Sequence, residues 1–243
     1  MKRALVCAAL LLVCSSALAE GPSGYERMVL SVAPSTALCA WFSKYDTRLH
    51  VFNDGDDALA QICVARNCAR VGKRAAATIS GPVTSNPLPA FIYVPREVAD
   101  RVHLTLMVES TNYGLADRAF TEIPIIRESE FRHRVQLLGV RVDEGFRVTV
   151  RVYGLEVPKD TLSVIRIFDM NTNDLLYEEI YGFQSFPNAP DVSMECDITN
   201  YGYKIKHRDL RIEVESSRED ARIYAFVSTT DNATQRFTVI TPK

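Results

Sequence analysis

Cysteine carries the most versatile chemistry in this chain, because its thiol can form a disulfide, bind zinc or remain free. Six cysteines are present, and four of them lie beyond the first nineteen residues: Cys39, Cys63, Cys68 and Cys196. An even number of cysteines in an exported chain predicts two disulfides, with three alternative connectivities. Cys63 and Cys68, separated by four residues, are the best local pair. Cys39 and Cys196 would then bridge two domains or stay free.

Zinc binding by the same four thiolates is the competing interpretation. The Cys63-x4-Cys68 spacing is looser than the C-x2-C spacing of a usual zinc knuckle, and an oxidising compartment favours disulfides. We therefore predict disulfides, no metal site and no cofactor, with free thiols as the remaining alternative.

The disulfide prediction depends on export, which the N-terminal residues indicate. Lys2 and Arg3 precede an apolar run over residues 4–13, and Ala17-Leu18-Ala19 supplies the small residues that signal peptidase requires. Residues 1–19 are therefore predicted to be a signal peptide, and the mature protein is expected to be secreted or periplasmic. No later apolar run approaches twenty residues, so no integral membrane segment is expected in the mature chain.

Other catalytic signals are sparse. The four histidines, His50, His103, His133 and His207, are too far apart in the sequence to form a usual metal-binding pair. No Gly-x-Ser-x-Gly nucleophile motif and no glycine-rich phosphate loop is present. The formal net charge of −2 gives no reason to expect a nucleic acid as partner. The chain is predicted not to be an enzyme, although a carboxylate pair assembled only in space would leave no motif.

Two clusters could bind ligands. Residues 53–57 (NDGDD) are acidic enough for calcium, but they lack the EF-hand spacing, and a turn is the simpler interpretation. Four aromatic residues, Tyr177, Tyr181, Phe183 and Phe186, could form a sugar-binding platform. Packing in or at the rim of the core is the favoured explanation for them.

The elements that would position these residues are predicted to be short strands. Residues 146–153 alternate between apolar and polar side chains. One face carries Phe146, Val148 and Val150, and the other carries Arg147, Thr149 and Arg151. Only the apolar face is therefore expected to be buried. Similar alternation occurs over residues 102–108 and 210–214. Further strands are predicted at residues 28–32, 47–53, 58–64, 74–79, 91–94, 135–140, 162–168, 175–181, 223–228 and 236–241.

Turn residues separate these strands. Residues 53–57, 143–145 and 171–174 contain the Asp, Asn and Gly that tight hairpins need. A single helical turn is predicted at residues 96–101.

The number of strands predicts two domains. A corner rich in acids and arginine, a strand, a polar loop and a final strand occur in that order over residues 96–124 and again over residues 218–242. We therefore predict an all-β fold of two tandem antiparallel β-sandwiches, spanning residues 20–127 and 128–243. Asp100 and Asp220 stand just before a strand, as in immunoglobulin-like domains, although the tyrosine and cysteine of antibody domains are missing.

Several segments are similar to those of uncharacterised exported bacterial proteins with two tandem immunoglobulin-like domains. They are residues 90–96 (AFIYVPR), 99–102 (ADRV), 121–124 (TEIP), 225–228 (AFVS) and 238–242 (TVITP). This resemblance implies a fold and an exported location, and it implies no activity.

The expected function is therefore that of a non-catalytic binding or structural module. Its partner would be a protein or a glycan, contacted through loops or an exposed sheet edge. One alternative is a periplasmic chaperone-like protein with a cationic cleft between two domains; Arg127, Arg132 and Arg134 lie near the predicted boundary. The other is a hydrolase with a carboxylate pair in a deep polar cleft.

Overall fold

The computed structural model describes residues 23–38, 43–64, 67–84, 88–112, 118–186, 189–200 and 205–243. Over these residues the protein is all-β, and its helical turns are the short 3-10 helices η2 (Arg96–Arg101), η3 (Glu128–Glu130) and η4 (Ile198–Asn200). Helix η2 is the helical turn predicted at residues 96–101. No helix in the described chain is long and apolar enough to cross a membrane. The predicted signal peptide lies outside the described residues.

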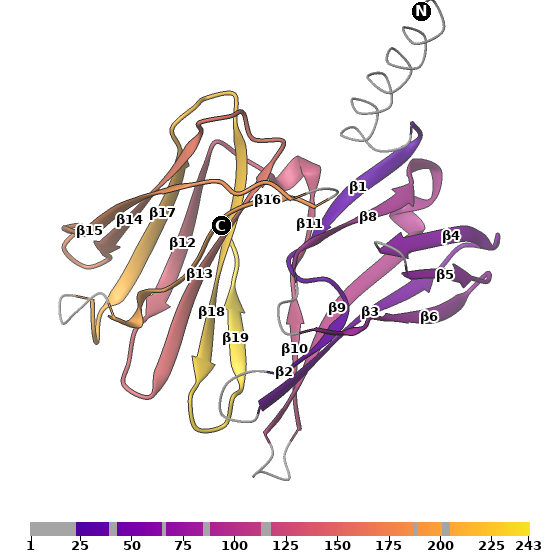
Figure 1. Ribbon diagram of the computed structural model, residues 1–243, viewed down its shortest axis with the longest axis horizontal. Helices are drawn as coiled ribbons and strands as arrows, with labels where there is room; N and C mark the ends of the chain where they lie inside the picture. The colour runs from indigo at the N-terminus through magenta and orange to yellow at the C-terminus, as the bar shows by residue number, and fades with distance from the viewer. Residues whose placement is uncertain are drawn as a thin grey trace, which may run out of the picture.

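The strands of the first half (residues 23–127) form two sheets (Figure 1). One has the order β11-β1-β8-β4-β5, and the other has the order β10-β9-β3-β2-β7 with β6 also paired to β3. All pairings are antiparallel except the short parallel pair β2–β7. The bounds are β1 (Tyr25–Leu30), β2 (Ser35–Leu38), β3 (Ser43–Asn53), β4 (Leu59–Val64), β5 (Asn67–Val71), β6 (Ala75–Ser80), β7 (Val83–Thr84), β8 (Ala90–Pro95), β9 (Val102–Asn112), β10 (Arg118–Ile123) and β11 (Ile125–Arg127).

The strands of the second half (residues 131–243) form two antiparallel sheets, β12-β17-β14-β15 and β16-β13-β18-β19. Isolated bridges between Arg132 and Ile223, and between Gln184 and Val192, join the two sheets along their sides. The bounds are β12 (Arg134–Arg141), β13 (Phe146–Leu155), β14 (Leu162–Asp169), β15 (Leu175–Gly182), β16 (Asp191–Asp197), β17 (Asp209–Ser216), β18 (Arg222–Asp231) and β19 (Phe237–Ile240).

Among the described strands, no sheet combines strands from both halves. The repeated sequence pattern corresponds to two antiparallel strand pairs, β9–β10 and β18–β19. The division into domains 20–127 and 128–243 stays a prediction.

Two of the three predicted hairpins are wrong. Residues 53–57 join β3 to β4, and residues 143–145 join β12 to β13, but the strands of each pair belong to different sheets. The third, at residues 171–174, is a hairpin between β14 and β15, and Asn173 has the positive φ of +62° that such a turn needs. Turn residues specify that the chain reverses, but they do not specify which strand it pairs with afterwards.

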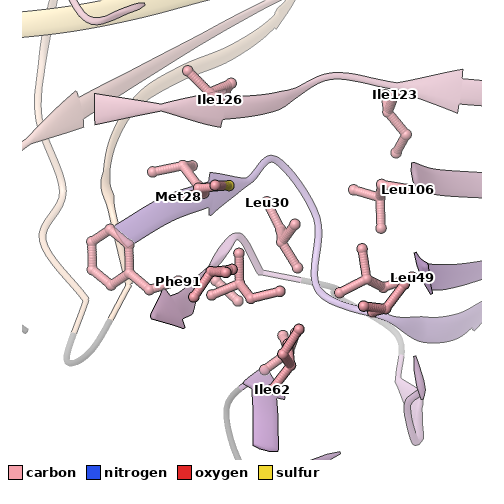
Figure 2. Close-up of a cluster of buried hydrophobic side chains, with 14 of the residues drawn as sticks. Met28, Leu30, Leu49, Ile62, Phe91, Leu106, Ile123 and Ile126 are labelled. Carbon is pink, nitrogen blue, oxygen red and sulfur yellow. The ribbon is translucent and has the colours of Figure 1, made fainter. Parts of the chain in front are cut away.

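The first-half sheets enclose one hydrophobic core. Figure 2 shows side chains from both sheets converging on this core, among them Leu30, Leu49, Ile62 and Leu106, which are fully buried. A second core lies between the two second-half sheets and is built mainly from valine and isoleucine.

The strands β13 and β18 are buried on both faces. Val148 and Val150 are fully buried in the second core, as the alternation predicted. On the opposite face, Tyr153 and Phe226 are 4% and 2% exposed and pack with the first core. The prediction that this strand has a single buried face is therefore wrong at its C-terminal end, where the first half covers the other face.

Arg27 ties the two halves together. Its guanidinium bonds Glu128 of η3, donates to the Glu156 carboxylate after β13 at 2.7 Å, and lies 4.8 Å from the centre of the Phe91 ring. Burial would lower the pKa of Arg27, but the bonds to the two carboxylates outweigh burial and raise it. Three further hydrogen bonds between described residues cross this boundary: from Thr121 Oγ1 to the Phe237 carbonyl at 2.8 Å, from Tyr153 Oη to the Ser31 carbonyl at 3.1 Å, and from Tyr45 Oη to Gln235 Oε1 at 3.0 Å.

Replacing Phe226 tests the burial of the second face. We expect Phe226→Ala to lower the free energy of unfolding by about 3 kcal/mol, because it leaves a cavity against Tyr153. Phe120→Ala is the matched control, since Phe120 is 61% exposed; its effect should stay within about 0.5 kcal/mol. Urea unfolding measures both, and equal effects would contradict the arrangement.

Replacing the Arg27 partners should be more damaging than replacing Arg27. In Arg27→Met the side chains of Glu128 and Glu156 remain 37% and 48% exposed and can be hydrated, so the expected loss is about 1 kcal/mol. In Glu128→Ala/Glu156→Ala a guanidinium only 7% exposed loses both carboxylates, so the expected loss is about 3 kcal/mol. Urea unfolding that gives the reverse order would contradict this account.

Candidate functional site

The predicted cysteine pair lies on adjacent strands. The register of β4 and β5 places Cys63 directly opposite Cys68. Directly opposed residues have Cβ atoms about 4.5–5.5 Å apart, close to the separation that a disulfide needs. Cys39 lies outside the described residues, and the backbone of Cys196 on β16 is paired with Val150. The disulfides stay predictions.

The acidic loop at residues 53–57 is organised by Asn53, which is 1% exposed. Its Nδ2 donates to the carbonyls of Asp57 at 2.7 Å and Gly72 at 3.0 Å, and its Oδ1 accepts from the Gly55 amide at 3.0 Å. The amide oxygen that a calcium ion would need is therefore used within the loop. No group of three or more His, Cys, Asp or Glu side chains that could hold a metal occurs among the described residues.

The histidines make separate local contacts. His50 Nδ1 lies 3.1 Å from Thr78 Oγ1, and His103 stacks on Phe52. His207 Nδ1 lies 3.2 Å from the carboxylate of Asp143. Desolvation raises the pKa of Asp143, but the bonds from Arg141 and His207 outweigh it and lower that pKa.

The strongest candidate site is a cavity of about 760 Å³ between the two halves. Its first-half wall comes from the segment after β1, from β2, β3, β9 and β10, and from the segment before β8. Its second-half wall comes from β13, β16, β18, β19 and the end of β15 with the segment after it. This volume lies within the range of about 300–1,000 Å³ that is usual for small-molecule sites.

The floor of the cavity is the outer face of β13 and β18. The register pairs Arg147 with Thr230, Thr149 with Ser228, and Arg151 with Phe226. The floor therefore changes along the strands from polar at Arg147 to aromatic towards Phe226.

The two floor arginines differ in their surroundings. Arg151 donates to Ser228 Oγ and lies 5.7 Å from the centre of the Phe226 ring, and the β16 register places Glu195 opposite it. Arg147 is exposed and has no hydrogen-bond or ion-pair partner among the described residues. No aspartate or glutamate is among the described residues that line the cavity.

Buried hydroxyl groups also lie at this boundary. Ser31 lines the cavity, and its Oγ is buried without a hydrogen-bond partner in the described structure, as is the Oγ of the nearby Ser35. A buried polar group without a partner is costly, and both oxygens have almost no accessible surface, so they are a local cost of packing and do not open into the cavity.

The sequence indicated only part of this site. Phe183 and Phe186, from the aromatic cluster, line the cavity, and Tyr177, Tyr181 and Phe183 pack against the second core. Arg147 was expected on a solvated strand face, and its role was missed because alternation cannot reveal which surface covers that face.

The three arginines near the predicted domain boundary make local contacts outside the cavity. Arg127 pairs with Glu26 at 3.5 Å, Arg132 donates to backbone carbonyls, and Arg134 bonds Glu213. None of the three lines the cavity.

Comparisons with protein-family models, with curated proteins and with solved structures gave no match. The resemblance to exported bacterial proteins is thus supported only at the level of an all-β, sandwich-like fold.

The opposed cysteines give a direct prediction. Because Arg66 lies between them, trypsin should yield two peptides that remain joined through a Cys63–Cys68 disulfide in the non-reduced protein and separate on reduction. Cys63→Ala/Cys68→Ala should lower the free energy of unfolding by about 2 kcal/mol. Cys39→Ala is the control that keeps the link. Alkylation of both Cys63 and Cys68 in the folded, unreduced protein would contradict the prediction.

Proposed function

We propose that this chain is an exported, non-catalytic binding module of two immunoglobulin-like β-sandwiches that holds its ligand in the cavity between them. The observation that carries the proposal is a cavity of about 760 Å³ with Arg147 on its floor, an arginine that has no partner among the described residues. The signal-like residues 1–19 support export.

The lining favours binding over hydrolysis. A hydrolase of the carboxylate type needs two acids that converge on the substrate. The described lining supplies arginine, serine, threonine, tyrosine and glutamine as its polar side chains, and no acid. These groups orient a ligand, and they include no carboxylate to act as general acid or base.

A chaperone-like function is the second candidate, and one observation favours it. Such a protein is expected to have a cationic cleft between its two domains, and Arg147 and Arg151 lie in the cavity between the halves. Its partner would be an extended protein segment that pairs with a sheet edge. Strand β15 is an edge strand in the described sheet, and Leu175 and Ile180 on it are more than half exposed.

Native mass spectrometry of the exported protein tests cavity binding. We expect a co-purified small molecule at one per chain, and we expect Leu88→Trp to reduce its occupancy at least about tenfold by filling the cavity. Leu175→Trp is the matched control, because Leu175 is similarly exposed and does not line the cavity. Equal occupancy in both variants, or no small molecule in the wild type, would contradict the proposal.

A further inference from the structure

We propose that the cavity ligand is an amphipathic organic anion, namely a single aliphatic chain ending in a carboxylate, and that Arg147 binds the carboxylate. This inference rests on the proposed function, since it assigns the chemistry of the ligand in the same cavity.

The charge of the lining selects an anion. Arg147 contributes a permanent positive charge that no described group neutralises, and no described acid lines the cavity. Arg151 already donates to Ser228 Oγ and lies over the Phe226 ring, so we assign the head group to Arg147 alone. A guanidinium binds a carboxylate through two parallel hydrogen bonds, which neither an alcohol nor an ammonium group can accept in that form.

Hydroxyl groups surround the position of the head group. Thr230 is paired with Arg147 in the register, and Ser228 lies two residues before it on the same face. Both are nearly buried and line the cavity. Hydroxyl donors of this kind can bind carboxylate oxygens that the arginine leaves unsatisfied.

The rest of the lining suits an aliphatic chain. Apolar side chains from both halves contribute much of it: Val32, Leu88, Val108, Ile123, Phe183 and Phe237. A sugar would need polar partners around its whole ring, and the described lining offers one side-chain amide, that of Gln184, and no carboxylate. An apolar chain needs only to be removed from water.

Isothermal titration of the full chain with decanoate and with 1-decanol tests the inference. We expect decanoate to bind at one site per chain and more tightly than 1-decanol. Arg147→Ala should weaken decanoate binding about tenfold or more and should change 1-decanol binding less than about twofold. Arg147→Lys should give an intermediate affinity, because a lysine keeps the charge but loses the planar pair of donors.

Arg70→Ala is the matched control. It removes the same charge as Arg147→Ala, and Arg70 on β5 is exposed and does not line the cavity. It should leave both affinities unchanged, and circular dichroism should show that each variant is folded.

The outcomes separate the two proposals. Equal binding of decanoate and 1-decanol, both blocked by Leu88→Trp, would overturn the anion inference and leave cavity binding intact. A co-purified neutral molecule would do the same. No binding of either probe and no co-purified molecule would overturn both. Arg147-dependent binding of an apolar peptide, with no binding of decanoate, would overturn the inference in favour of the chaperone-like function.

Discussion

The burial of β13 and β18 on both faces is the constraint on which the rest of the structure depends. One face closes the valine-rich core of the second half, and the other presents Tyr153 and Phe226 to the core of the first half. Aromatic side chains bury large areas, so this second face contributes strongly to stability. The contact between the halves is therefore part of the hydrophobic core of the first half.

The same face explains why a cavity exists. On this face of β13 the side chains change from buried Tyr153 at the C-terminal end to exposed Arg147 at the N-terminal end. A charged side chain cannot be buried in an apolar contact without a partner, so the halves cannot close on Arg147 as they do on Tyr153. The polar end of the floor therefore stays open to solvent or ligand.

The sequence predicted most of the strands, because period-two alternation is a local property that survives in the fold. It did not predict strand pairing, since residues 53–57 and 143–145 have turn residues that serve a hairpin and a crossing between sheets equally well. It singled out Cys63 and Cys68 as the best local pair through their spacing alone, and the strand register places them opposite each other. It missed Arg147 and Arg151 as cavity residues because what covers the second face of β13 depends on contacts more than one hundred residues apart, such as the bond from Tyr153 to Ser31.

The two ends of the boundary between the halves also differ in how their arginines are satisfied. Arg27 is buried beside the C-terminal end of β13, and Glu128 and Glu156 supply the opposite charge that its burial requires. Arg147 stands at the N-terminal end of the same strand with no acid of the described lining beside it. Within the part of the chain that the structure describes, acidic partners thus stand where the boundary is closed and are absent from the lining where it is open. An arginine that folding does not require to be paired keeps its hydrogen-bonding capacity for a ligand, which is why the open end of β13 is the place where a binding function is to be sought.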